Sequence, residues 1–134
     1  MWKSLYVALP ALLCAALAYP SFALSKKADD APYAHMVFFT LKDGSKESVE
    51  AFVAVCDKYL SKHEGSKYYS LGTMAEDSNE PVSVKDFHVA LHSVFESKAA
   101  CNNYLVSERH KAFLGEVKDK FEKVRVFDSY LVKP

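Results

Sequence analysis

The sequence predicts an α+β domain of the ferredoxin-like kind, a β-α-β-β-α-β plait with a four-stranded antiparallel sheet and its helices on one face. Three observations predict it. Runs of apolar, β-branched and aromatic residues alternate with segments of helical periodicity in that order. Turn residues separate these segments. The 134 residues also leave room for a single core.

The first strand is predicted over Ala34 to Lys42 (AHMVFFTLK), and the turn signal Asp43-Gly44 ends it. Ser45 or Ser48 can cap the helix that follows. The apolar residues of this helix recur at the spacing of one helical face: Val49, Phe52, Val53, Cys56 and Leu60.

The middle of the chain predicts two strands joined by a loop. Lys67 to Ala75 forms the second strand, in which Gly72 is expected to make a bulge, and Glu76 to Pro81 is a polar loop. Phe87 to Phe95 (FHVALHSVF) forms the third strand.

The last third predicts an interrupted helix and a final strand. Ser97 caps a helix that is expected to break near Ser107-Glu108 and to continue as a second helical stretch. Val124 to Val132 (VRVFDSYLV) forms the fourth strand.

The first strand is apolar on both of its faces, which predicts a homodimer. Val37 and Phe39 lie on one face, and Met36 and Phe38 lie on the other. Helices on one side leave the second face of the sheet without a cover, and an antiparallel sheet that meets water there should alternate apolar and polar residues. The same surface of a second copy, related by two-fold symmetry, would cover it and form a homodimeric α/β barrel.

The N-terminal residues predict export. Residues 1–23 have the three regions of a cleavable signal peptide: Lys3, an apolar run from Leu5 to Ala18, and the small residues Ser21 and Ala23 before a cleavage site. A membrane anchor is the alternative, although Pro10 and Pro20 disfavour a spanning helix.

Cleavage leaves a polar, flexible lead-in at 24–32 and a domain at 33–134, secreted or periplasmic and not attached to a membrane. Export permits a disulfide between Cys56 and Cys101, but both cysteines fall on apolar helix faces, which favours two buried thiols.

The charge distribution excludes nucleic-acid binding. The chain has 17 basic and 17 acidic side chains, and without Lys3 the exported part keeps 16 basic against 17 acidic. No cluster of lysine and arginine forms the positive patch that such binding requires.

Several segments, taken together, make the chain resemble the stress-responsive A/B barrel family. They are HMVFFTLKDG (35–44), YYSLGT (68–73), DFHVALHSVFESKAA (86–100), YLVSERHKAF (104–113) and VRVFDSYLV (124–132). The resemblance covers the whole domain and implies a dimeric α/β barrel. It implies no single activity, because the members of one fold family differ in function.

The resemblance also implies a candidate catalytic pair. A plant polyketide cyclase of the family carries a Tyr-x5-His-x2-Phe pattern that Tyr104, His110 and Phe113 match, and His35 matches the first-strand histidine of the family. The third-strand histidine of that enzyme falls at Val89 here. An imidazole can act as general base and a phenol can orient or donate; the alternative is that both side chains are structural.

A ligand pocket is the second candidate site. Its expected residues are His35, Phe52, Tyr68, His88, Val89, His92 and Phe113. Ordinary core packing explains the same aromatic residues, and sequence does not distinguish a cavity from filled space. The histidines do not predict a metal or haem site, because strand positions four apart lie about 13 Å apart, and no cofactor is expected.

These observations favour an exported dimeric barrel that binds a small apolar or aromatic molecule. The alternative is a cofactor-free enzyme, polyketide-cyclase-like or monooxygenase-like, that uses Tyr104 and His110. A purely structural or interaction module is the third hypothesis. The identity of a ligand or substrate does not follow from the sequence.

Overall fold

A four-stranded antiparallel sheet forms the centre of the computed structural model, with the strands in the order β2-β3-β1-β4. The structure describes residues 31–132, so the predicted signal peptide, most of the lead-in and the last two residues lie outside the described part. The strands are β1 (Tyr33–Leu41), β2 (Ser66–Thr73), β3 (Val89–Phe95) and β4 (Phe121–Tyr130). This topology is the predicted ferredoxin-like plait.

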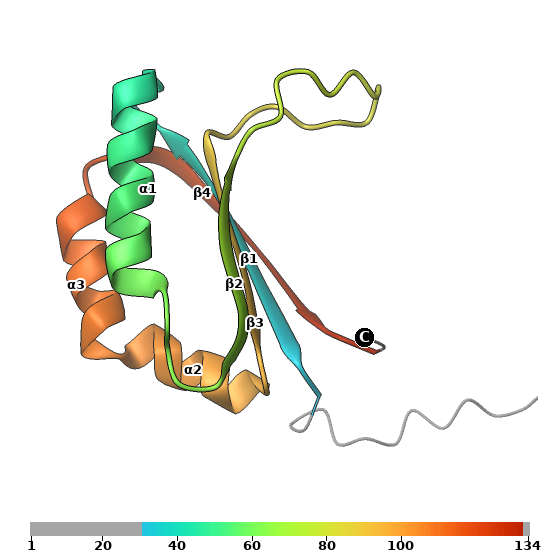
Figure 1. Ribbon diagram of the computed structural model, residues 1–134, viewed down its shortest axis with the longest axis vertical. Helices are drawn as coiled ribbons and strands as arrows, with labels where there is room; N and C mark the ends of the chain where they lie inside the picture. Colours follow the sequence, from blue (N-terminus) through green and yellow to red (C-terminus); the bar gives the residue numbers. More distant parts are fainter. Residues whose placement is uncertain (1–30, 133–134) are drawn as a thin grey trace, which may run out of the picture.

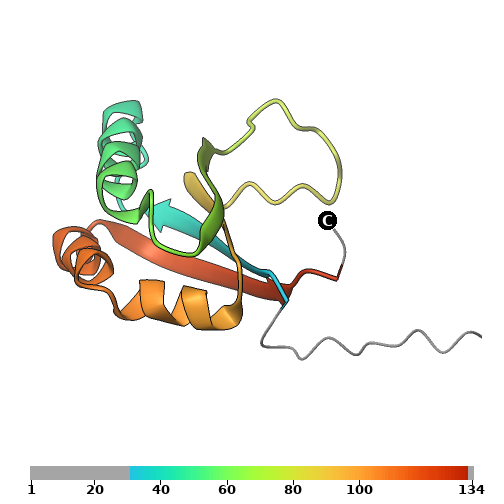
Figure 2. The same cartoon turned by 60° about the horizontal axis from the view of Figure 1, so that its bottom comes forward.

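All three helices cover the same face of the sheet (Figure 1). They are α1 (Lys46–Leu60), α2 (Lys98–Val106) and α3 (Glu108–Val117). The long loop between β2 and β3 lies on the opposite side of the sheet, as Figure 2 also shows. The sheet therefore has a helix face and an open face, and the loop reaches over one end of the open face.

Serine side chains set the helix starts, as the sequence predicted. The Ser45 oxygen accepts a hydrogen bond from the Ser48 amide at the start of α1, and the Ser97 oxygen accepts one from the Ala100 amide at the start of α2. Ser107 ends α2 and caps α3, so the expected break in the second helical segment is confirmed. Each cap satisfies an amide that has no partner within its helix.

Several strand boundaries differ from the prediction. The second strand ends at Thr73 and the third begins at Val89, so the loop between them is longer than Glu76 to Pro81. The fourth strand runs from Phe121 to Tyr130 and not from Val124 to Val132, because Phe121 and Lys123 still pair with the end of β1. Propensity does not reveal this pairing, since polar residues are tolerated on an edge strand.

The predicted bulge at Gly72 is wrong. Gly72 pairs in regular register with Ala90, and the irregularity of β2 lies between Ser66 and Tyr68. The space around Gly72 is open, so no close approach requires a glycine there.

Alternate residues of β1 form the centre of the core on the helix face. Val37 and Phe39 are about 5% exposed or less, and the Phe39 ring centre lies 5.1 Å from that of Phe52 and 6.3 Å from that of Phe113. The edge-to-face angles are typical of aromatic packing. The apolar faces of α1 and α3 thus meet at the centre of the sheet.

The open face of β1 and β3 is apolar as well. Ala34 and Ala90 are buried, and Met36 and Phe38 are partly buried beside them. Cys56 and Cys101 are free, buried thiols on the helix side, in agreement with the favoured prediction. No helix within residues 31–132 is long and apolar enough to cross a bilayer.

Candidate functional site

Three histidine rings on the helix side surround the first candidate residue, Tyr104. The ring centre of Tyr104 lies 4.8 Å from that of His110, 4.7 Å from that of His63 and 6.0 Å from that of His35. We call these four residues the His-Tyr cluster. Tyr104 is 3% exposed, so the structure does bring the two predicted catalytic residues and His35 together in a buried place.

Ser107 fixes the geometry of Tyr104 and His110. Its hydroxyl donates to the Tyr104 carbonyl oxygen at 2.7 Å and accepts from the His110 amide at 3.2 Å. Because α2 stops and α3 restarts at this residue, the two side chains come from two different helices. The Tyr-x5-His spacing therefore depends on the helix break and not on one continuous helix.

His110 has the features of a neutral base. Burial lowers its pKa, and the neighbouring His35 lowers it further, while a backbone hydrogen bond at Leu105 acts in the opposite direction. Its Nδ1 atom is buried and has no hydrogen-bond partner among residues 31–132. A neutral imidazole with a free nitrogen can accept a proton from a bound molecule.

Tyr104 has the features of a hydrogen-bond donor. Burial raises its pKa above the ordinary value, and the neighbouring Cys101 adds to the increase. Burial also raises the pKa of the Cys101 thiol to about 11 and that of Cys56 to about 12. The phenol and both thiols therefore stay protonated at neutral pH, and the cysteines are not nucleophiles.

His35 is held by a carboxylate that the sequence analysis missed. Its Nδ1–H donates to Oδ1 of Asp128 on β4 at 2.8 Å, and the two residues are direct partners in the β1–β4 register. The signal was an acidic residue inside the apolar run VRVFDSYLV. Only the strand pairing shows that this carboxylate faces His35, since the two are 93 positions apart.

A groove of about 380 Å³ lies beside the cluster at the end of α1 and the start of β2. Its wall includes Asp57, Lys62 and His63. The Nε2–H of His63 donates to the Tyr59 carbonyl oxygen at 2.8 Å. His63 thus touches both the groove and the buried Tyr104 ring.

The seven residues predicted to line one pocket lie in different places. His35, Phe52, Val89 and Phe113 are on the helix side, where the last three are part of the packed core. Tyr68 and His92 pair in register with residues of the open face, Val94 and Met36. The Nδ1 atom of His88 accepts a hydrogen bond from the Leu41 amide at the end of β1. The sheet itself separates these groups.

The open face carries a pocket of its own. It has a volume of about 350 Å³, and its walls are Phe38, Val84, Phe87, Arg125 and Phe127. We call it the open-face pocket. The Phe38 ring makes edge-to-face contacts with Phe87 and Phe127, with ring centres 4.9 and 5.6 Å apart. Phe127 is 55% exposed, so the pocket is open to solvent in the single chain.

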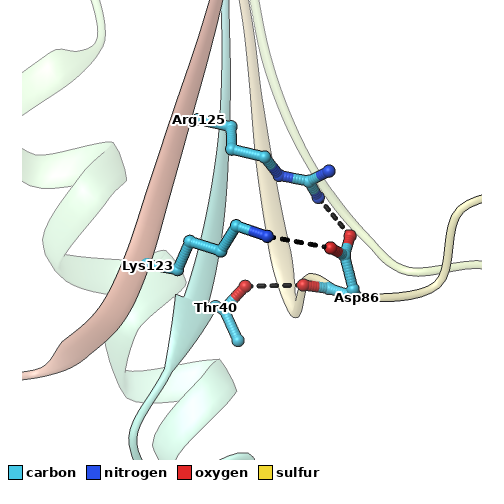
Figure 3. Close-up of polar contacts among 4 residues, drawn as sticks. All are labelled: Thr40, Asp86, Lys123 and Arg125. Carbon is cyan, nitrogen blue, oxygen red and sulfur yellow. Dashed lines mark hydrogen bonds and ion pairs between the residues drawn. The ribbon is translucent and has the colours of Figure 1, made fainter.

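A clip of polar contacts joins the β2–β3 loop to β1 and β4 (Figure 3). The Thr40 hydroxyl donates to the Asp86 carbonyl oxygen at 2.6 Å. Lys123 Nζ lies 3.2 Å from one Asp86 carboxylate oxygen, and Arg125 donates to the other. The clip therefore joins the loop to β1 and β4 beside two of the pocket residues, Phe87 and Arg125.

No three side chains of the described residues are arranged to hold one metal ion. The His-Tyr cluster contains three histidines, but His35 is paired with Asp128 and His63 with a backbone carbonyl. The imidazole and phenol groups of this cluster can perform acid-base chemistry.

The model of the stress responsive A/B barrel domain family matches residues 33–131. No curated protein matches the chain closely enough to count as a relative.

Solved structures share the fold. A dabb family protein with a ferredoxin-like fold from Mesorhizobium loti is 24% identical, with a TM-score of 0.65 over 77% of this chain and 99% of that one. A dimeric ferredoxin-like protein of unknown function from Thermobifida fusca is 15% identical, with a TM-score of 0.61 over 75% and 92%. The hydroxynitrile lyase of Passiflora edulis is 22% identical, with a TM-score of 0.62 over 78% and 97%.

Proposed function

The chain belongs to the stress responsive A/B barrel domain family, and we propose that it is an exported homodimer that binds a small apolar or aromatic molecule. The observation that carries the proposal is the open-face pocket, in which Phe38, Phe87 and Phe127 form the walls of a space of about 350 Å³. This volume is in the range of small-molecule sites, which are mostly apolar and have few polar groups.

The apolar open face supports the dimer. Two aromatic side chains of this face, Phe127 and Tyr68, are more than half exposed in the single chain. Burial of apolar surface contributes about 25 cal/mol per Å², so a second copy on this face gains free energy from covering these rings. The Thermobifida fusca neighbour is described as dimeric. A dimer formed in this way encloses the open-face pocket between two sheets.

The pattern of residues 1–23 supports export. A basic start, an apolar run and small residues at 21 and 23 are the parts of a cleavable signal peptide. Export places the ligand site in the periplasm or outside the cell.

Two residues of β4 offer a matched test of binding and dimerisation. Phe127 lies on the open face, whereas Tyr130 is exposed to 39% and pairs with Tyr33, whose side chain lies on the helix face. We expect Phe127→Ala to weaken the dimer in sedimentation velocity and to lower the affinity for a neutral aromatic probe, 1-naphthamide, by about tenfold, the loss expected for one well-packed ring. Tyr130→Ala should leave both unchanged. A monomer at micromolar concentration that no neutral aromatic stabilises against heat would overturn the proposal.

A cofactor-free enzyme, polyketide-cyclase-like or monooxygenase-like, is the second candidate function. The observation that favours it is the position of His110 beside the Tyr104 ring, with a buried Nδ1 atom that has no hydrogen-bond partner in the described part of the chain. In this hypothesis, neutral His110 removes a proton from an acidic carbon of the substrate, and the Tyr104 hydroxyl donates a hydrogen bond to the oxygen that gains charge.

Turnover of a linear β-polyketide thioester tests the second candidate. Replacing His110 with Ala should lower the rate by about 10²-fold or more if His110 is the base. Tyr104→Phe should lower the rate as well, whereas Tyr59→Phe, a tyrosine of α1 outside the His-Tyr cluster, should not. A His110→Ala variant with the full rate would end the assignment.

A further inference from the structure

The open-face pocket has one charged wall. Arg125 of β4 lines the pocket together with three phenylalanine rings, and its side chain is 25% exposed. The other walls are apolar, namely Val84 and the phenylalanines. A pocket with an apolar body and a single guanidinium fits a molecule that has an apolar body and a single anionic group.

The hydrogen-bonding capacity of Arg125 is not used up. A guanidinium has five N–H donors. Arg125 Nη2 donates to Asp86, and a guanidinium can donate to carboxylates through more than one of its N–H groups.

The charges of the clip also favour an anion. Two basic side chains, Lys123 and Arg125, share the single carboxylate of Asp86. Burial acts to raise the Asp86 pKa, but the hydrogen bond from Lys123 and the charge of Arg125 outweigh it and lower that pKa. Asp86 is therefore ionised at neutral pH, and the side chains of Asp86, Lys123 and Arg125 together carry one net positive charge.

We propose that the open-face pocket binds a small carboxylate with an aromatic or other apolar body, with the carboxylate on Arg125 and the body among Phe38, Phe87 and Phe127. This inference rests on the proposed binding function and adds to it the charge of the ligand and the residue that recognises this charge. The ion pair with Asp86 holds the Arg125 guanidinium next to the loop between β2 and β3 (Figure 3).

Two probes of similar shape measure the contribution of the ligand's negative charge separately from that of its aromatic rings. The carboxylate probe is 1-naphthoate, and the neutral probe is 1-naphthamide, which has the same rings. Isothermal titration of the purified protein should give an affinity for 1-naphthoate about tenfold or more above that for 1-naphthamide, because a charge-assisted pair with arginine is about twice as strong as a neutral hydrogen bond.

The variants Arg125→Met and Lys123→Met remove one positive charge each from the same clip. Only Arg125 lines the pocket. We expect Arg125→Met to lower the affinity for 1-naphthoate by about tenfold and to leave that for 1-naphthamide within about threefold, whereas Lys123→Met should keep the preference for the carboxylate. If Arg125→Met does not fold, as judged by circular dichroism, Arg125→Lys replaces it and should lose part of the preference, because an ammonium lacks the planar fork.

Three results would overturn the inference. Equal affinities of the wild-type protein for the two probes would remove the role of charge while leaving the proposed binding function intact. An equal loss in both methionine variants would show a general effect of charge and no site at Arg125. A dimer that binds neither probe would mean that the second copy itself fills the pocket, and the proposed binding function would then fall together with the inference.

Discussion

The rings of Tyr104 and His110 lie 4.8 Å apart at 67°, although the two residues belong to different helices. One serine between them holds this arrangement, because the Ser107 hydroxyl bonds to the carbonyl of Tyr104 and to the amide of His110. The candidate acid-base pair thus depends on a helix cap. This relationship leads to the first prediction.

Ser107→Ala should lower the free energy of unfolding by about 1 kcal/mol, the usual cost of removing a helix cap. It should also move the imidazole NMR signals of His110, since its amide loses the bond to the serine. Chemical denaturation and histidine NMR measure the two effects.

Ser97→Ala is the control for that variant. Ser97 caps the other end of α2, where its side chain accepts a hydrogen bond from the Ala100 amide. This variant should lose similar stability without moving the His110 signals. Unchanged His110 signals in Ser107→Ala would contradict the positioning role.

The pH dependence of stability should report on His110. Because burial lowers its pKa, the unfolded chain binds a proton at this histidine more readily than the folded chain. The folded protein should therefore be fully stabilised with respect to this group above about pH 6.5, the unfolded value, and should lose stability as the pH falls from there toward the lowered folded pKa.

His110→Gln tests this dependence, because glutamine does not titrate. Urea denaturation between pH 5 and pH 8 should show a smaller loss of stability at the acidic end for this variant than for the wild type. Lys111→Met, on the same helix, should keep the wild-type slope, since lysine does not titrate in this range. Identical slopes for wild type and His110→Gln would argue against a buried, neutral His110.

Asp86→Asn should loosen the loop between β2 and β3. The substitution weakens the contacts of this side chain with Lys123 and Arg125 and leaves the bond from Thr40 to the backbone carbonyl. We expect faster amide hydrogen exchange within residues 74–88 and little change in Tm, because exposed ion pairs contribute little to global stability.

High salt should produce a similar increase in exchange in the wild type, because salt screens exposed ion pairs. Asp77→Asn changes the same charge within the same loop and has no ion pair with β4. It serves as the control and should exchange like the wild type. Equal exchange in all three proteins would show that the clip does not restrain the loop.

The mature N-terminus should be Leu24. If residues 1–23 are a cleavable signal peptide, processing after Ala23 follows from the small residues at 21 and 23. Intact mass spectrometry of the protein recovered from an exporting host measures this directly. A protein that keeps Met1 in the membrane fraction would support the anchor hypothesis instead.

The sequence by itself determined the order of the elements, the helix break at Ser107 and the apolar character of both faces of β1. These features depend on local signals: periodicity, capping side chains and alternation along a strand. The pairing of Tyr104 with His110 was implied by the family resemblance, and the helix break at Ser107 brings the two rings together. The family resemblance agreed with this order.

Only the tertiary structure decided which distant residues meet. The partnership of His35 with Asp128 and the clip of Asp86 with Arg125 join positions far apart in the chain, and their register depends on how four strands align. The same alignment put Tyr68 and His92 on one side of the sheet and Phe52 and Phe113 on the other. Side-chain direction alternates along every strand. The residues predicted to line one pocket therefore lie in two separate places, on opposite faces of the sheet.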